Sequence, residues 1–275
     1  MTNFLNDPLM EEQFTKIKGL IYKYPKRVLL ELNNICPIYC QFCTRKRKTF
    51  LEKKWRLNKK ELEDILVFLE KNKEIKEVII SGGDPLMSPK ELIFLLKKME
   101  ELENIKVIRI HTRMPITAPE KISNDIFDFL NDCKKNIYLS IHCNLAQEIN
   151  DEGVEILKRF RKTGVILYSQ SVFLKGINDS VEKLEELFEK LLELGVKPYY
   201  IYRCDPVTGL EKFIVPFKKE KEIMTELRKR ISGLAYPTYV IDASMGCGKI
   251  PVPLNFWKND KSFFDFNNKL IEIDE

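Results

Sequence analysis

The feature that most constrains the fold is a regular alternation between apolar runs typical of strands and amphipathic segments typical of helices. The strand-like runs cover residues 27–33, 76–81, 105–111, 136–142, 165–173 and 197–203. Helices are expected between them, at residues 58–72, 88–102, 119–131, 146–163 and 180–194. Strands that alternate with helices in this way form parallel βαβ units. We therefore predict an α/β fold that closes into a barrel or a partial barrel.

Apolar positions inside the expected helices recur at helical spacing, which is typical of a face that packs on a core. The clearest stripes are Leu62, Ile65, Leu66 and Leu69, and Leu184, Leu187, Phe188 and Leu191. A chain of 275 residues can bury a large core. Because no linker interrupts it, we predict one domain, with a lead at 1–26, a barrel core at 27–236 and a lysine loop and tail at 237–275.

The residue types that carry chemistry gather where the expected strands end. A cysteine loop follows the first strand, and Ser81 to Pro85 follow the second. The later strand ends carry His111-Thr112-Arg113, His142-Cys143-Asn144, Gln170 and Arg203-Cys204-Asp205. In parallel α/β folds, chemistry occurs at the carboxyl ends of the strands. We therefore expect these residues to surround one site.

The cysteine loop has the spacing C-x3-C-x2-C, with thiols at Cys36, Cys40 and Cys43. Three thiolates on a tight loop can hold three irons of a cubane cluster and leave the fourth iron open to a small molecule. The alternative is a structural zinc site, which usually takes four Cys or His ligands. The next cysteine in the chain is Cys133, far from this loop. The spacing therefore favours an open iron–sulfur cluster.

Two glycine-containing segments are further candidates. The turn from Ser81 to Pro85 holds Gly82 and Gly83, which either form an ordinary turn or let backbone groups approach a ligand. Lys249 follows Gly248 after another strand-like run. A lysine there is either solvated or able to form a Schiff base with pyridoxal phosphate (PLP).

The composition excludes several classes of protein. The chain is 44% apolar and 32% charged, with a net charge of +5, as in globular proteins. No secretory signal and no apolar run of about 18 residues is present, so we expect a cytoplasmic protein without a membrane partner. The basic run at 45–48 lacks an aromatic-rich face, so we expect no nucleic-acid partner.

Several stretches together resemble lysine 2,3-aminomutase and its relatives, which are radical S-adenosylmethionine (SAM) enzymes that also use PLP. The matching stretches are Tyr24 to Arg27, Cys36 to Arg47, Ser81 to Pro85, Arg109 to Pro115, Gln170 to Val172, Lys175 to Asp179, Gly195 to Tyr200, and Pro237 to Pro251. They extend from residue 24 to about 253 in the order of the family. The resemblance implies a partial (β/α)6 barrel of the radical SAM type.

The resemblance also implies cofactor roles. Cys36, Cys40 and Cys43 would hold a [4Fe–4S] cluster, and Lys249 would hold PLP as an internal aldimine. Tyr24 and Arg27 match residues near the PLP phosphate. The SAM contacts implied are Ser81, Gly82, Gly83, Asp84, His142 and Gln170.

The implied substrate is L-lysine, whose α-amino group would move to carbon 3 through chemistry of PLP and a 5′-deoxyadenosyl radical, giving β-lysine. Arg45 matches the residue that binds the substrate carboxylate, a task that suits a planar guanidinium. Asp205 and Asp242 match the acids that receive the side-chain ammonium. Two converging carboxylates repel unless a cation lies between them, although each aspartate is alternatively a turn residue or a helix cap.

Three alternatives remain open. The same chemistry on glutamate is disfavoured by the acid pair, and a lysine derivative is a further substrate. The third is an iron–sulfur protein without catalysis. The resemblance also implies an electron donor such as ferredoxin or flavodoxin, and an oligomer is possible.

The chain departs from the family at the lysine loop, where Ser244, Met245 and Cys247 replace a proline and two glycines. The well-known members are longer and carry cysteines for a zinc site after this loop, which we do not expect here. Cys133 and Cys143 are expected to be buried apolar residues.

Overall fold

The computed structural model describes residues 4–243 and 247–272. Within these residues one sheet contains ten strands, which neighbour one another in the order of the sequence, β1 to β10. The strands are β1 Thr15–Ile17, β2 Leu20–Tyr24, β3 Arg27–Asn33, β4 Glu77–Gly82, β5 Val107–Thr112, β6 Asn136–His142, β7 Ile166–Val172, β8 Lys197–Tyr202, β9 Thr238–Ala243 and β10 Gly248–Pro251. A second sheet consists of β11 Trp257–Asn259, β12 Ser262–Phe264 and β13 Leu270–Glu272.

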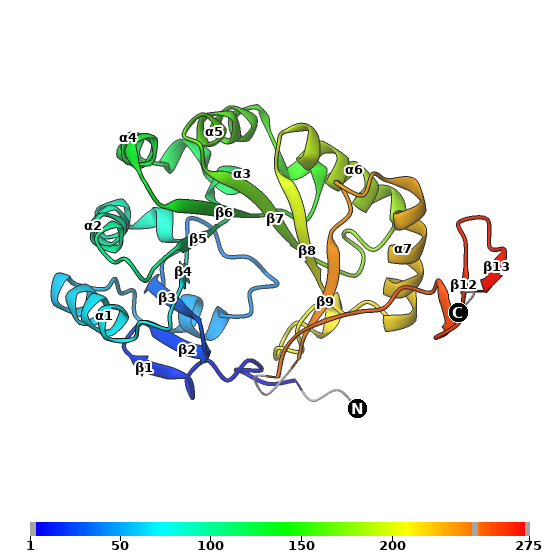
Figure 1. The fold of residues 1–275 in the computed structure, drawn as a ribbon, viewed down its shortest axis with the longest axis horizontal. Helices are drawn as coiled ribbons and strands as arrows, with labels where there is room; N and C mark the ends of the chain where they lie inside the picture. Colours follow the sequence, from blue (N-terminus) through cyan, green and yellow to red (C-terminus); the bar gives the residue numbers. More distant parts are fainter. Residues whose placement is uncertain (1–3, 244–246, 273–275) are drawn as a thin grey trace.

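Strands β3 to β9 are all parallel, and helices connect each to the next. The helices are α1 Lys59–Lys71, α2 Pro89–Glu100, α3 Met114–Thr117, α4 Asn124–Asp132, α5 Asp151–Lys162, α6 Val181–Glu193 and α7 Phe217–Arg230. The strands curve along the inside and the long helices cover the outside (Figure 1). The outer strands β1 and β10 do not pair with each other, so the barrel is open.

The strand and helix predictions between residues 27 and 203 are confirmed. Strands β3 and β6 have the expected bounds, and the other predicted strands differ by one or two residues. The expected helix at 119–131 begins only at Asn124, because Pro119 opens a separate short turn at Pro119–Lys121. Likewise the helix at 146–163 begins at Asp151, where Asn150 caps it.

The predicted apolar stripes pack on the sheet. Leu184, Leu187, Phe188 and Leu191 of α6 are fully buried in one hydrophobic cluster. Leu62, Ile65 and Leu69 of α1 are buried in the same cluster, and Leu66 packs against it from a partly exposed position. Each fully buried side chain of this size stabilises the fold by about 1.5–3 kcal/mol.

Several elements were not predicted. Helix α7 was not predicted because its few buried apolar positions, Ile223, Met224 and Leu227, lie within a highly charged sequence. Strands β1 and β2 are short and form a hairpin at Gly19, whose φ of 80° is readily adopted only by glycine. The sheet of β11 to β13 lies beyond α7, where the chain ends (Figure 1).

The position of Lys249 differs from the expected loop. Lys249 lies in β10, which pairs antiparallel with β9 and places Lys249 directly opposite Asp242. Ser244 and Met245, two of the departures from the family pattern, lie outside the described residues.

The other two cysteine predictions have different outcomes. Cys143 is fully buried, as expected, whereas Cys133 is only partly buried at the end of α4.

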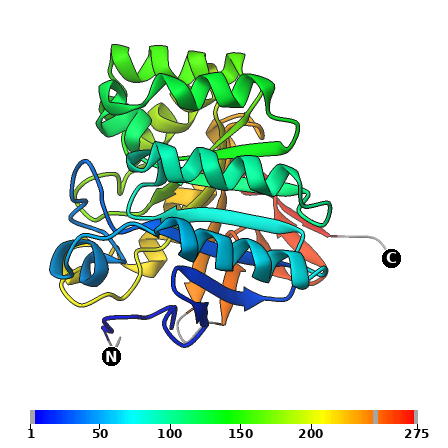
Figure 2. The ribbon, with the colours of Figure 1, turned by 90° about the vertical axis from the view of Figure 1, so that its left-hand side faces the viewer.

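In the described part of the chain, no helix is long and apolar enough to cross a membrane. Figure 2 shows the long helices stacked along the outer face of the sheet.

Candidate active site

The fold builds one large cavity at the carboxyl ends of the parallel strands, with a volume of about 610 Å³. Every residue to which the family resemblance gives a role lines this cavity, whereas five other strand-end residues expected around the site do not line it: Pro85, Cys143, Asn144, Arg203 and Cys204. The lining residues with such a role are Tyr24, Arg27, Cys36, Cys40, Cys43, Arg45, Ser81, Gly82, Gly83, Asp84, His142, Gln170, Asp205, Asp242 and Lys249. A cavity of this volume is large enough for a cofactor and a small ligand.

The three cysteines of the loop after β3 form one wall. Burial raises the pKa of Cys36 to about 12, with further contributions from the negative charge of Asp84 and from the neighbouring thiols Cys43 and Cys40. The guanidinium of Arg113 donates a hydrogen bond to Cys40 Sγ at 2.8 Å. A thiolate in this wall therefore needs nearby positive charge, which Arg113 supplies in part.

The glycine turn at the end of β4 packs directly against the start of the cysteine loop. A Cβ on Gly82 would lie 2.3 Å from the carbonyl oxygen of Asn33, and a Cβ on Gly83 would lie 2.3 Å from that of Ile35. Both contacts are too close for any side chain. Close packing of two backbones therefore explains these glycines, whatever ligand the turn binds.

Asp84 connects the ends of two strands. Its carboxylate accepts hydrogen bonds from the hydroxyl of Thr112 at 2.8 Å and from the backbone N–H groups of Leu86, Arg113 and Met114. The residue therefore fixes the end of β5 relative to the glycine turn, and it also lines the cavity.

Two partly buried histidines line the cavity, and a lowered pKa keeps each imidazole neutral at pH 7. Burial, and then the positive charge of Arg113, lowers the pKa of His142 to about 3. Burial and the charge of Arg109 lower the pKa of His111 well below its usual value. Gln170 lies 3.4 Å from His111 Nδ1, and the Nε2 atoms of both histidines are buried without a partner in the described part of the chain. Each of these two nitrogens therefore has unused hydrogen-bonding capacity.

Asp205 and Asp242 approach each other at another end of the cavity. Burial and the negative charge of Asp242 raise the pKa of Asp205 to about 7, although the Lys249 ammonium opposes this shift. Lys249 Nζ forms a short ion pair with Asp242 Oδ2. The other carboxylate oxygen, Oδ1, is buried without a partner among the described residues. This end of the cavity is built to receive a cation.

Tyr24 and Arg27 lie beside the lysine strand. They are opposite each other in the β2–β3 hairpin, and the Arg27 guanidinium lies 4.1 Å from the centre of the Tyr24 ring. The Tyr24 hydroxyl is 3.7 Å from the position that a Cβ on Gly248 would take. A hydroxyl and a guanidinium are thus available near Lys249, a combination that suits an anion such as a phosphate.

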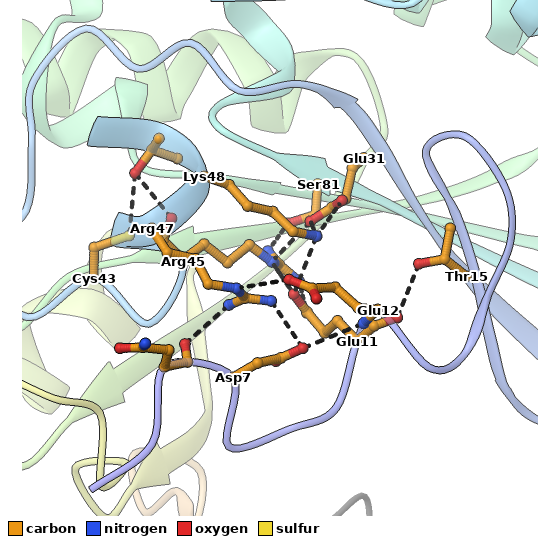
Figure 3. Close-up of polar contacts among 12 residues, drawn as sticks. Asp7, Glu11, Glu12, Thr15, Glu31, Cys43, Arg45, Arg47, Lys48 and Ser81 are labelled. Atoms are coloured by element: carbon orange, nitrogen blue, oxygen red, sulfur yellow. Dashed lines mark hydrogen bonds and ion pairs between the residues drawn. The ribbon is translucent and has the colours of Figure 1, made fainter. Parts of the chain in front are cut away.

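Arg45 is already engaged by acidic groups. Its Nε and Nη2 atoms bond to the Glu11 carboxylate, with Nη2 to Oε1 at 2.5 Å, and Nη1 donates to Ser81 Oγ at 3.0 Å (Figure 3). The carboxylate of Glu31 lies 3.3 Å from Nε. Lys48 bonds Glu31 at 2.8 Å, so two cations and two carboxylates form one network.

This network sets the charge state of Glu11. Burial alone raises the pKa of Glu11, but the charge and hydrogen bonds of Arg45, helped by Lys48 and Arg47, outweigh it and lower that pKa to about 2. Glu11 is therefore fully ionised at neutral pH.

Sequence reasoning did not assign roles to several residues of this site. Glu11 lies in a segment without regular pattern, and Glu31 lies in a strand that otherwise reads as apolar. A signal existed only for His111, which lies at the penultimate position of β5, and for Arg113, which directly follows that strand. A wall of tyrosines beside Arg109 was also missed; its members are Tyr168, Tyr199, Tyr200 and Tyr202.

Comparison with known proteins identifies similar sequences. Residues 30–198 match the Radical SAM superfamily. The chain is 36% identical to an L-lysine 2,3-aminomutase of Bacillus subtilis, over 92% of this chain and 53% of the relative. It is also 36% identical to an L-lysine 2,3-aminomutase of Buchnera aphidicola, over 92% of this chain and 74% of the relative. The chain thus spans only about half the length of the Bacillus protein.

The fold is similar to that of solved structures. A radical SAM methyltransferase from Sphaerobacter thermophilus superposes with a TM-score of 0.57 at 16% identity, over 82% of this chain and 71% of that chain. Identity this low concerns the fold alone. The likeness confirms the prediction of a partial barrel of the radical SAM type.

Proposed function

Because the chain belongs to the lysine 2,3-aminomutase family within the radical SAM superfamily, we propose that it moves the α-amino group of L-lysine to carbon 3, giving β-lysine. The proposal includes a [4Fe–4S] cluster, SAM and PLP as cofactors, and an external electron donor of the ferredoxin or flavodoxin type. When bound, the cluster with SAM supplies radical chemistry, and PLP supplies a ring that delocalises an unpaired electron. The protein's own residues supply binding, orientation and exclusion of water.

The thiol wall suits a cubane cluster at Cys36, Cys40 and Cys43. Across residues 4–243 and 247–272, no three His, Cys, Asp or Glu side chains converge as ligands of a single ion. A cubane spreads its ligands over separate irons, so it needs thiols around a cavity wall instead of a single point. The raised pKa of Cys36 also requires a cation before a thiolate forms, and iron supplies that charge.

The residues beside β10 suit PLP. Lys249 supplies the amine for a covalent bond, and Arg27 with Tyr24 supplies donors for the phosphate. Lys249 is partly exposed to the cavity, which gives the cofactor access to its nitrogen.

Another part of the cavity lining suits SAM, which carries a positive sulfonium and an amino acid end. We assign its contacts to Ser81, Gly82, Gly83, Asp84, His142 and Gln170, all of which line the cavity. The pKa of His142 near 3 keeps this imidazole neutral, so it does not repel the sulfonium.

One observation carries the choice of lysine as the substrate. The cavity has an acidic end, at Asp205 and Asp242, and a guanidinium, Arg45, elsewhere on its wall. The ammonium of Lys249 forms an ion pair with Asp242. This pair supports the view that the acidic end of the cavity binds an ammonium of the kind that a lysine substrate carries. A glutamate side chain would be repelled by the same pair of carboxylates.

The test is anaerobic reconstitution with iron, sulfide and PLP, followed by SAM, a reductant and separate amino acids. We expect β-lysine from lysine, and little product from glutamate, alanine or Nε-acetyl-lysine. Borohydride should trap PLP on Lys249, and peptide mapping identifies the site. Equal turnover of glutamate would exclude the proposed substrate, and trapping unchanged in Lys249→Ala would exclude the proposed PLP site.

A further inference from the structure

The segment of residues 5–12, here called the N-terminal segment, lines the cavity at Leu9 and Glu11. Leu5 forms backbone hydrogen bonds with Pro206 and Thr208, at 2.9 and 3.2 Å, directly after Asp205. At the other side Asp7 pairs with Arg47 at 2.9 Å, and Glu11 pairs with Arg45 (Figure 3). The segment thus connects the loop after β8 with the loop after the cysteines.

Glu11 uses only part of the hydrogen-bonding capacity of Arg45. A guanidinium has five N–H donors, one on Nε and two on each Nη. Glu11 takes the Nε donor and one Nη2 donor, and Ser81 takes one Nη1 donor. One N–H on each of Nη1 and Nη2 has no partner among the described residues. Two N–H groups on neighbouring nitrogens of one guanidinium are the pair that binds a carboxylate in a bidentate manner.

Glu11 is also held firmly in place. It is only 7% exposed, and its carboxylate lies 3.8 Å from Lys48 Nζ in addition to its contacts with Arg45. Displacing Glu11 would leave a buried carboxylate without its partner, which is strongly unfavourable. A substrate carboxylate therefore gains more by adding to Arg45 than by replacing Glu11.

We propose that Glu11 is a positioning residue for the substrate, which holds the guanidinium of Arg45 by one edge so that its remaining N–H pair receives the substrate's α-carboxylate. The proposal rests on the function proposed above, in which Arg45 binds that carboxylate. It assigns Glu11 to the substrate site, because this side chain contacts Arg45 and the chain just before it is anchored at Pro206, beside Asp205.

The experiment compares Glu11→Gln with Glu11→Asp and with Glu12→Gln in the reconstituted holoenzyme. Glu12 is the matched control, because it is the next residue of the segment and its side chain is 70% exposed. Binding of lysine and of lysinamide is measured by calorimetry without reductant, and kcat and KM for lysine are measured with it. Lysinamide has no carboxylate, so it reports binding that does not depend on Arg45.

We expect Glu11→Gln to weaken lysine binding and to reduce kcat/KM by about a hundredfold, because small displacements of a binding group have effects of this size. Lysinamide binding, iron content and thermal stability should change little. Glu11→Asp keeps the charge and should recover part of the loss, and Glu12→Gln should resemble the unsubstituted protein.

Two results would overturn the inference. Tighter lysine binding in Glu11→Gln would mean that Glu11 competes with the substrate for Arg45. Equal losses for lysine and lysinamide, or no loss for either, would mean that Glu11 has only a structural role. Failure of the proposed function would appear differently, as an absence of lysine turnover in the unsubstituted protein, and it would remove the basis of the inference as well.

Discussion

The change Asp205→Asn tests the acidic end of the cavity most directly. The pKa of Asp205 is raised from its ordinary 3.8 to about 7 by burial and by the neighbouring charge of Asp242. The carboxyl is therefore partly protonated at neutral pH, until a cation arrives. A bound lysine ammonium supplies that cation, so substrate binding and ionisation of Asp205 favour each other.

The size of the effect follows from Coulomb's law. Two unit charges about 4 Å apart attract by about 1 kcal/mol in water and by about 4 kcal/mol at the effective dielectric of a protein surface. Since about 1.4 kcal/mol corresponds to a tenfold change, Asp205→Asn should raise KM for lysine roughly fivefold to a thousandfold. In the unsubstituted enzyme, KM should fall by up to about tenfold as the pH rises by two units through the pKa of Asp205, because the carboxyl then ionises.

The assay is kcat/KM for lysine relative to Nε-acetyl-lysine across this pH range. The acetylated side chain is neutral, so the ratio cancels titrations elsewhere. The ratio should rise with pH in the unsubstituted enzyme and stay flat in Asp205→Asn. A ratio that rises equally in both proteins would refute the assignment of this pH dependence to Asp205.

The raised pKa of Asp205 also predicts that ionisation of this carboxyl lowers the stability of the fold, although it favours lysine binding. A carboxyl with a folded-state pKa above its unfolded value stabilises the fold while protonated, and this contribution is lost as pH rises from about 4 to about 7. Without lysine, Asp205→Asn should therefore have a higher melting temperature than the unsubstituted protein at pH 8. A lower melting temperature would indicate that the ionised carboxylate is structural.

Three further predictions concern other parts of the cavity. Arg45→Lys keeps the charge but loses the planar fork, so kcat/KM for lysine should fall about a hundredfold, while iron content stays the same; unchanged kinetics would exclude a bidentate role. Cys40→Ala should abolish the brown colour and bound iron after reconstitution, measured by absorbance and iron analysis, and full iron retention would contradict the cluster assignment. Gly83→Ala would place a Cβ 2.3 Å from the Ile35 carbonyl oxygen and should lower the unfolding free energy by about 1–3 kcal/mol. Gly233→Ala, whose Cβ would have its nearest neighbour at 3.7 Å, should leave that free energy almost unchanged. Chemical denaturation measures both unfolding free energies.

Periodicity identified the parallel strands because these strands carry several buried apolar residues and are bounded by polar turns. Strand β6 has its predicted bounds, Asn136–His142. The helices that alternate with the parallel strands show clear apolar stripes. The short strands β1 and β2 lacked this pattern, because their pairing depends on a hairpin at Gly19 and on contact with β3. Tertiary context thus decided the edges of the sheet, whereas local sequence decided its centre.

The cavity lining was predictable for a related reason. Parallel strands bring their carboxyl ends to one edge, so residues after β3, β4 and β8 meet although they are far apart in the chain. Glu11 could not be predicted in this way. It lies before the first strand, and only the folded path of the N-terminal segment brings it to Arg45.

The register of β9 and β10 adds a constraint that no motif expresses. Because Lys249 and Asp242 are directly opposite each other, the amine proposed to bond PLP is also the cation that neutralises Asp242. A covalent bond from Lys249 to PLP, as the proposed function requires, takes this amine out of its ion pair. Asp242 then lacks a cation, and Asp205 beside it is harder to ionise. The ammonium of a bound lysine again places a cation beside Asp242. The pairing of β9 with β10 thus means that a bond between PLP and Lys249 favours the binding of a cationic substrate.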